Sequence, residues 1–358
     1  MKLGFFTMPI HPLDKDWRQS LAEDREAFLL ADQLGFSEGY VGEHLTDKAE
    51  NITSCMLFLA ALSTDIRKLR LGTGTVNLPN AHPAAVAGQI AMLDHMLDGR
   101  LIFGISPGGL LSDAEAFGNL DRDRTAMFVE AIDMILEIWR SDPPYDLSGR
   151  HWQVSTSRTM MPEIGQGILP RPLQQPHPPI VVTAVAPYSK GVIAAAERGW
   201  EMISANFLLP KWVATHWPQY KKGCEAAGKA PDPSTWRIAK SVFVADTLRT
   251  AREYALGPAS PYRYYYTQIV TKMKHSGRAN LFLEDPSASA DTDISIDDVL
   301  DKLVIWGTPD KVADDLAAFQ EQTGEFGTLL YAGKDWADPA LAKRSMVLLA
   351  ESVAPRLP

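Results

Sequence analysis

The chain of 358 residues is 46% hydrophobic and 22% charged, a composition typical of a globular protein with a large core. The formal net charge is −9 and no basic stripe occurs, which argues against nucleic acid or an anionic membrane as a partner. No signal-peptide core and no run of about 18 apolar residues is found, and the two cysteines lack metal-ligand spacing, so we expect no membrane span and a cytoplasmic location.

Strands and helices alternate through the first 140 residues. The expected elements, in chain order, are a strand at 2–7, a helix from Trp17 to Leu34 that ends at Gly35, a strand at 36–44, a strand at 69–79, a helix at 84–97, a strand at 100–106 and a helix from Arg124 to Trp139. The short connections between them indicate βα units and a parallel sheet.

The second half repeats this pattern. The expected elements are a strand at 179–185, a helix capped by Ser189 that ends at Gly199, a strand at 200–207, a strand at 237–245, a helix starting at Pro309 and a strand at 326–333. The helix ends and strands around Gly35 and Gly199 resemble each other, as expected of repeated units. With about eight strands, the sequence predicts an α/β fold, a (β/α)8 TIM barrel formed by residues 1–358 as one domain.

Two segments interrupt the repeat. Residues 141–178 are rich in proline and contain no clear helix, and residues 255–296 combine a run of tyrosines with a polar end. Both are predicted to be irregular insertions, which in a compact barrel are either lids or surface loops. The tyrosine run favours a lid for the second segment.

The ends of the predicted strands carry the candidate functional residues, because the active site of such a barrel lies at the carboxyl ends of its strands. Glu43 and His44 leave one strand together, in the sequence VGEHLTD, although a solvated turn would also explain them. Gly108 follows a second strand and allows close backbone approach to a ligand, unless this loop is only a connection. Tyr188 and Ser189 begin a helix and offer a phosphate site, although a simple cap is the commoner meaning.

Ser106 lies in the sequence GISPG, which is similar to the nucleophile elbow of hydrolases. Pro107 follows it directly and removes the N–H that an oxyanion hole would need. The sequence therefore argues against a serine hydrolase.

Three stretches together resemble the bacterial luciferase-like flavin-dependent monooxygenases. They are LGFSEGYVGEHLTD, the run from Asn77 to Gly104 with its LPxAHP and LDxxxxGR motifs, and WGTPDKVADDLAAF. The similarity extends over most of the chain and is densest over residues 34–118, and it is strongest to the limonene and diketocamphane monooxygenase-type branch.

This resemblance implies a two-component, FMNH2-dependent monooxygenase. Reduced FMN would come from a separate NAD(P)H:flavin reductase, since no dinucleotide-binding fingerprint is present, and O2 would form a C4a-peroxyflavin that oxygenates a small apolar substrate such as a terpene, cyclic ketone or aldehyde. Two alternatives remain. One is an F420-dependent hydride-transfer oxidoreductase of the same superfamily, and the other is a flavoprotein that binds its cofactor without catalysing a reaction. The resemblance also implies a homodimer.

Residues of the site carry over from the resemblance one by one. His44 matches the family's active-site histidine, an acid/base or peroxyflavin-stabilising group, and Gly74-Thr75 matches a non-prolyl cis peptide packed against the flavin. Ser106 stands where luciferase has a reactive cysteine. The remaining candidates come from the predicted strand ends: Gly108, Tyr188 and Ser189 for the cofactor, and Asn206 and Phe207 for the substrate. The resemblance adds that Pro107 replaces an arginine that helps to hold the FMN phosphate in luciferase.

Overall fold

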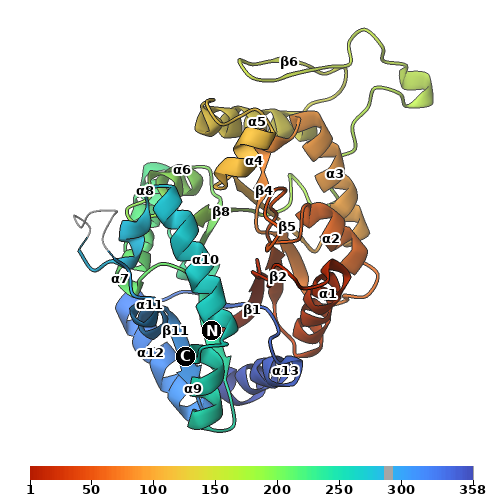
Figure 1. Cartoon of the computed structure of the whole chain (residues 1–358). Coiled ribbons are helices and arrows are strands. Elements are labelled where there is room, and N and C mark those ends of the chain that lie inside the picture. The colour runs from red at the N-terminus through yellow and green to blue at the C-terminus, as the bar shows by residue number, and fades with distance from the viewer. Residues whose placement is uncertain (286–292, 358) are drawn as a thin grey trace.

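Eight parallel strands close into a barrel in the computed structural model, which describes residues 1–285 and 293–357 (Figure 1). The barrel strands are β1 (Lys2–Thr7), β2 (Glu38–Val41), β3 (Arg70–Thr73), β5 (Leu101–Ser106), β8 (Ile180–Ala184), β9 (Glu201–Ser204), β10 (Arg237–Val244) and β12 (Thr328–Ala332). The ring closes because β1 pairs with both β2 and β12, and β10 pairs with both β12 and β9. The predicted (β/α)8 barrel is confirmed.

Helices surround this barrel. They are α1 (Trp17–Gln33), α2 (Cys55–Leu62), α3 (Pro83–Met96), α4 (Leu111–Ala116), α5 (Arg124–Arg140), α6 (Lys190–Glu197), α7 (Pro210–Val213), α8 (His216–Ala226), α9 (Leu248–Leu256), α10 (Pro261–His275), α11 (Ile296–Leu303), α12 (Pro309–Thr323) and α13 (Pro339–Leu348). Capping residues mark the ends of α1, for example. Asp16 caps its start by accepting from Gln19 N, and Gly35, with φ of +77°, follows its end. Among the described helices, none has the length and apolarity to cross a bilayer.

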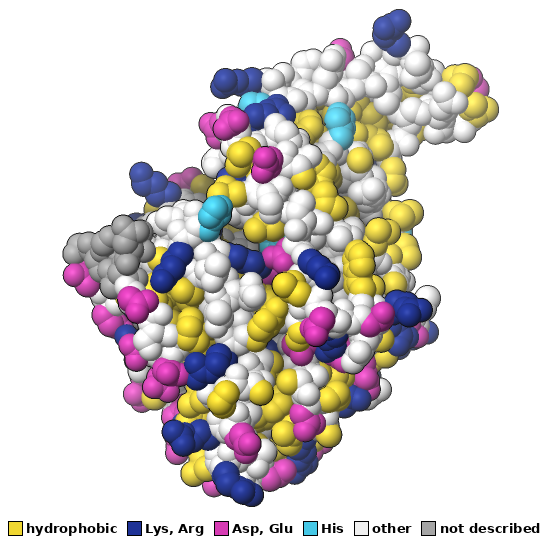
Figure 2. Space-filling model, in the orientation of Figure 1, with side chains coloured by type: hydrophobic (Ala, Val, Ile, Leu, Met, Phe, Trp, Pro, Cys, Tyr) yellow, Lys and Arg dark blue, Asp and Glu magenta, His cyan; other side chains and the backbone are white. Residues whose placement is uncertain are grey.

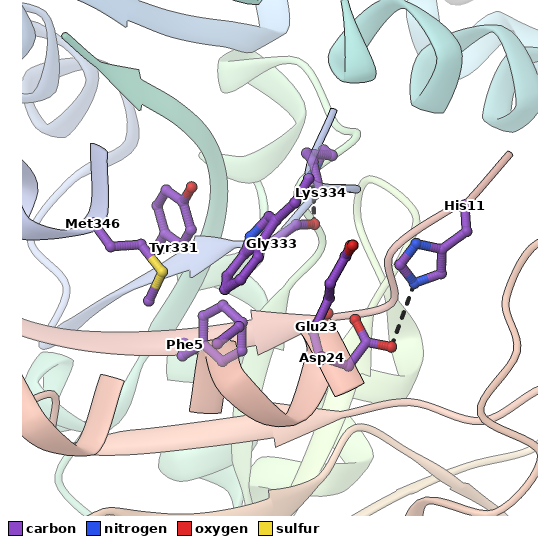
Figure 3. Close-up of a pocket in the computed structure, with 11 residues that line it drawn as sticks. Phe5, His11, Glu23, Asp24, Tyr331, Gly333, Lys334 and Met346 are labelled. Carbon is purple, nitrogen blue, oxygen red and sulfur yellow. Dashed lines mark hydrogen bonds and ion pairs between the residues drawn. The ribbon is translucent and has the colours of Figure 1, made fainter. Parts of the chain in front are cut away.

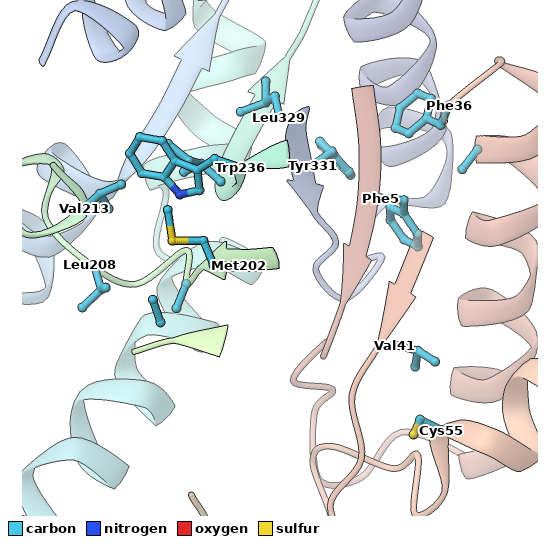
Figure 4. Packing of buried hydrophobic residues seen from close by; sticks show 14 of the residues in the cluster. Phe5, Phe36, Val41, Cys55, Met202, Leu208, Val213, Trp236, Leu329 and Tyr331 are labelled. Atoms are coloured by element: carbon cyan, nitrogen blue, oxygen red, sulfur yellow. The ribbon is translucent and has the colours of Figure 1, made fainter. Parts of the chain in front are cut away.

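Two apolar layers hold the strands and helices together. Inside the barrel lie Tyr40, Ile102, Val181, Ile203, Ala239 and Leu330. Gly72 makes room for the Tyr40 ring, since a Cβ at Gly72 would come within 2.3 Å of it. A second, larger layer lies between strands and helices and includes Phe5, Tyr331 and Trp236 (Figure 4). Each such large apolar side chain stabilises the fold by about 1.5–3 kcal/mol through burial.

An ion cluster fills the barrel at the end where the strands begin. Arg237, the first residue of β10, donates to Glu38 at 2.5 Å and to Glu201 at 2.5 Å, and these two carboxylates begin β2 and β9. A buried guanidinium is tolerated here because two carboxylates neutralise it. This end of the barrel is therefore closed, and the opposite rim remains for ligands.

Two predicted elements differ from the structure. The strand predicted at 69–79 divides at Gly74-Thr75 into β3 and the short β4 (Val76–Asn77), which pairs with β5. The segment at 255–296 is not irregular, because α10 occupies much of it. Ser260 caps α10, and the positions i, i+3, i+4 and i+7 place Tyr262, Tyr265, Tyr266 and Ile269 on its buried face.

The segment at 141–178 lacks an α-helix, as predicted, and extends away from the barrel (Figure 1). It contains the hairpin of β6 (Asp146–Ser148) and β7 (Gln153–Ser155). A short strand, β11 (Val304–Gly307), was not predicted and pairs with the end of β10. The part of the second predicted insertion at 286–292 lies outside the described residues.

Candidate functional site

His44 lies at the open rim of the barrel between two carboxylates. It follows β2, and its side chain is largely buried. Nδ1 donates to Asp113 Oδ2 at 3.0 Å, and Nε2 lies 3.1 Å from Glu50 Oε2. Asp113 belongs to α4, whereas Glu50 belongs to the loop between β2 and α2.

These contacts determine the charge of His44. Burial by itself would lower the pKa of His44, but Glu50 and Asp113 together raise it above its ordinary value. The pKa of Asp113 falls to about 2, because hydrogen bonds from His44 and from Thr46 outweigh the effect of burial. The two carboxylates, one at each ring nitrogen, therefore favour the imidazolium form of His44, which is a cation and a proton donor.

A lysine on α10 completes the charge network at the rim. Lys272 Nζ lies 2.5 Å from Asp47 Oδ2 and donates to Glu50 Oε1 at 3.0 Å. Glu50 thus contacts both cations of the network, His44 and Lys272. Because Lys272 comes from α10, these ion pairs fix that helix against the loop that follows β2.

The carboxylate of Glu43 bonds to backbone N–H groups rather than to the charged groups around His44. Its carboxylate accepts from Cys55 N at 3.1 Å, at the start of α2, and from Asn77 N at 3.2 Å, in β4. Burial raises the pKa of Glu43, and these donors offset part of that effect. Glu43 consequently joins β2, α2 and β4 into one unit, and His44 alone faces the network at the rim.

The predicted cis peptide at Gly74-Thr75 is present and lies beside Ser106. Thr75 Oγ1 donates to Ser106 Oγ at 2.7 Å, Ser106 Oγ donates to Asn77 Oδ1 at 2.8 Å, and Gly108 N donates to Ser106 Oγ at 3.1 Å. The structure therefore brings four predicted positions together, and Asn77 connects them to Glu43 and so to the backbone of His44.

Tyr188 and Ser189 stand at the end of β8, where α6 begins. Tyr188 is 64% exposed, has φ of +52°, and its N–H donates to Thr215 Oγ1 at 2.9 Å. Ser189 occupies the N-cap position, but its hydroxyl makes no capping hydrogen bond, so the predicted side-chain cap is wrong. The hydroxyl remains available beside the positive end of the helix.

Asn206 and Phe207 lie across the rim, after β9. The buried Asn206 amide accepts from Tyr265 at 3.1 Å and donates to Ser241 at 3.3 Å, while its backbone carbonyl accepts from Tyr266 at 3.2 Å. These contacts attach α10 to the barrel. Phe207 is only partly buried. Substrate binding by these two residues stays a prediction.

Sequence reasoning missed the partners of His44. Asp113 and Glu50 stand in stretches that look like ordinary polar turns, and no local pattern connects them with His44. Arg124 was also missed: its Nη1 donates to Gly108 O at 3.1 Å. Arg124 therefore brings a positive charge to the loop where Pro107 cannot supply one.

A second buried histidine lies in a small cavity between β1, β12 and α1 (Figure 3). His11 Nδ1 is 2.7 Å from Asp335 Oδ1, and its Nε2 is 3.3 Å from Asp24 Oδ2. Burial would lower the pKa of His11, but the two carboxylates raise it to about 9. His11 N also donates to Ala49 O at 2.9 Å, which connects this cluster to the loop that carries Glu50.

The same cluster contains a set of donors that would suit a metal ion. Within the described residues, one ligand atom each of His11, Glu23 and Asp335 lie within 4.8 Å of one another. Lys15 Nζ already lies 2.5 Å from Glu23 and 2.6 Å from Asp335. The ammonium group therefore supplies the positive charge that a metal would bring.

A model of the luciferase-like monooxygenase family matches residues 1–325. The chain belongs to this family. It is 31% identical, over 99% of its length and 92% of the relative's, to 4-hydroxyprotoasukamycin monooxygenase of Streptomyces nodosus subsp. asukaensis. It is 28% identical, over 98% of its length and 85% of the relative's, to limonene 1,2-monooxygenase of Rhodococcus erythropolis.

The fold of this chain is similar over its full length to that of a solved luciferase-like structure. The oxygenating constituent of 3,6-diketocamphane monooxygenase from Pseudomonas putida, a type II Baeyer-Villiger monooxygenase in complex with FMN, superposes with a TM-score of 0.88 at 26% identity. The match includes 100% of this chain and 99% of that chain. The predicted resemblance to this family is confirmed.

The His11 cluster predicts a pH dependence of folding stability. Because the pKa of His11 rises from 6.5 to about 9 on folding, its stabilisation is complete below pH 6.5 and is lost as the pH rises through 9. The loss amounts to about 3 kcal/mol. Denaturant unfolding of His11→Gln should lack this decline, whereas His275→Gln, at an exposed position, should retain it. An identical decline in both variants would contradict the assignment.

Proposed function

We propose that this chain is the oxygenase component of a two-component, FMNH2-dependent monooxygenase. The observation that carries the proposal is the position of His44 between the carboxylates of Asp113 and Glu50, at the rim of a luciferase-like barrel. A fixed cation and proton donor at this place suits a reaction in which negative charge develops on oxygen.

Several groups at the rim would suit reduced FMN. Ser189 has an uncommitted hydroxyl at the start of α6, and Arg124, which has no carboxylate partner among the described residues, adds positive charge at the Gly108 loop. Both suit the phosphate. Thr75 and Ser106, beside the cis peptide, suit the flavin ring. When bound, reduced FMN would supply the electrons that activate O2.

The chain's own residues then exclude water, position the reactants and provide a proton. The helix α10 lies over the rim with Tyr265 and Tyr266 buried beneath it, and Lys272 fixes it to the loop that follows β2. This arrangement limits access of water to the site. Within the site, His44 holds a proton at Nδ1 and Nε2 and can transfer one to an oxygen of the reacting group.

The relatives and the sequence support a proposal for the substrate class and for the reductase. Limonene and diketocamphane monooxygenases, by their names, act on small apolar molecules, and we extend this class to the present chain. A further relative, from Acinetobacter baylyi, is the oxygenase component of trigonelline monooxygenase. Since the sequence lacks a dinucleotide fingerprint, a separate NAD(P)H:flavin reductase would deliver FMNH2.

Rapid mixing tests this function. The anaerobic protein, loaded with reduced FMN, is mixed with oxygenated buffer while absorbance is recorded. We expect oxidised flavin to appear more slowly than it does with free reduced FMN, and a small cyclic ketone to be oxygenated. Oxidation at the rate of free flavin, together with binding of F420, would favour the F420-dependent alternative instead.

His44 provides a second test. The variant His44→Gln removes the ionisable group but preserves a polar side chain, and we expect the rate of product formation to fall by about 10²–10⁴-fold, with a lower yield of product per flavin oxidised, while the fold is retained. Activity of the native protein should also fall as the pH rises above the raised pKa of His44, since the proton donor is then lost. The exposed variant His95→Gln serves as the control. An unchanged yield in His44→Gln would contradict this role.

A homodimer is proposed from an exposed apolar surface. Leu57 on α2 is 74% exposed, and Met92 and Met96 on α3 are 57% and 44% exposed. Figure 2 shows hydrophobic side chains gathered at the right-hand edge, where these helices lie in Figure 1. Such a patch marks an association site.

Sedimentation or light scattering should therefore give twice the 39.5 kDa of one chain. The double variant Met92→Lys, Met96→Lys should sediment as a monomer, because two charges would enter the interface. Leu248→Lys, at an exposed apolar position on α9, should leave the dimer intact. A measured mass of 39.5 kDa for the native protein would contradict the proposed dimer.

A further inference from the structure

The segment 141–178 projects from the barrel as an arm, and its far end carries exposed apolar side chains. None of residues 157–168, here called the tip, is buried. Three of them are large and apolar: Met161 is 38% exposed, Ile164 is 69% exposed and Ile168 is 48% exposed. Figure 2 shows hydrophobic side chains at the end of this arm. Apolar side chains gathered on a projecting segment indicate a contact with another molecule.

The tip is held in shape by its own backbone. Met161 N donates to Gln166 O at 3.0 Å, and Gln166 N donates to Met161 O at 3.1 Å. Gly165, with φ of +74°, makes the turn between them. A loop that is ordered before it binds loses less conformational entropy on docking. The tip therefore has the form expected of a docking element.

The base of the same arm carries a groove that suits such side chains. This α5–β6 groove lies between α5 and β6, has a volume of about 900 Å³, and its apolar lining is Ala126, Val129, Met134 and Leu147. The strand β6 pairs with β7, and its other edge meets no strand in the described part of the chain. The groove is therefore open and has room for several side chains.

Most of the carboxylates along the α5–β6 groove already have partners. Glu130 accepts from three backbone N–H groups of the β6–β7 turn, at 2.8 to 2.9 Å. Asp133 pairs with Arg198 at 2.6 Å, and Glu137 pairs with Arg140. Because these charges are neutralised within the chain, the groove does not call for a basic partner. An apolar occupant matches its lining better.

The arm also leads toward the surface that is proposed for the dimer. Its returning stretch lies along α3, where Arg171 O is 3.1 Å from His95 Nε2. The same helix carries the exposed Met92 and Met96. Figure 1 shows the arm extending beyond α3. A second copy that docks on α2 and α3 would therefore come within reach of the tip.

We propose that the tip of one copy occupies the α5–β6 groove of a second copy. In a twofold dimer the two arms would lie side by side in opposite directions, so both tips and both grooves are covered at once. Ile164 and Ile168 would then pack against Val129 of the partner subunit. The inference rests on the proposed homodimer and adds a second contact to it.

Cross-linking tests the position of the tip. The two native cysteines are buried, so newly introduced surface cysteines are the reactive thiols. Under mild oxidation we expect the variant Ile164→Cys, Val129→Cys to form a covalent dimer of twice 39.5 kDa on a non-reducing gel. Ile164→Cys, Leu147→Cys is a second pair at the same groove. The control pair Ile164→Cys, Leu248→Cys, with one cysteine on α9, should remain at 39.5 kDa.

Sedimentation tests the contribution of the tip to association. In Ile164→Asp, Ile168→Asp we expect the dissociation constant of the dimer to rise at least about tenfold, because two charges would enter an apolar groove. The circular dichroism spectrum should be unchanged, since both side chains are exposed in the single chain. Leu248→Asp, at an exposed apolar position on α9, should leave the dissociation constant unchanged.

The outcomes separate this inference from the proposed dimer. A native protein of 39.5 kDa would contradict both. A native dimer in which neither groove pair cross-links would overturn this inference alone, and so would an unchanged dissociation constant in Ile164→Asp, Ile168→Asp. Loss of free thiols without a gain in mass would place the tip in the groove of its own chain and would also overturn it. No flavin is used, so the results do not depend on the proposed chemistry.

Discussion

Closure of the parallel barrel is the constraint on which the rest of this structure depends. The ring closes where β10 pairs with both β9 and β12, and every pair in it is parallel, so all the carboxyl ends meet at one rim. The opposite end is filled by Arg237 with its two carboxylates, so little space remains there for a ligand. The chemistry of the protein is thereby confined to a single opening.

At that opening, ion pairs join segments that are far apart in the sequence. Two cations, His44 and Lys272, meet three carboxylates, those of Asp47, Glu50 and Asp113. In a partly buried setting such pairs are stronger than at an open surface, and they also fix geometry. The network connects the loop after β2 with α4 and with α10, so the helix over the site and its proton donor form one unit.

The His11 cluster supports this unit from behind. Its two carboxylates hold the loop between β1 and α1, and the backbone of His11 in turn supports the loop that carries Glu50 and Asn51. The ion pairs and the backbone hydrogen bonds together hold this loop in place, so the side chains that it carries stand on a rigid support.

The barrel could be predicted from the amino-acid sequence, because periodic apolar residues and helix-ending glycines are local signals that repeat along the chain. The sequence also placed His44 at a strand end, and the family resemblance located the cis peptide at Gly74-Thr75. It did not predict α10, because the run of tyrosines concealed the helical spacing of its buried face. The groups that surround His44 become visible only in the folded chain: Asp113 is 69 residues away in sequence, and Lys272 contacts Glu50 across 222 residues. Such pairings leave no local pattern, since each depends on where the closed barrel places the ends of distant strands and helices.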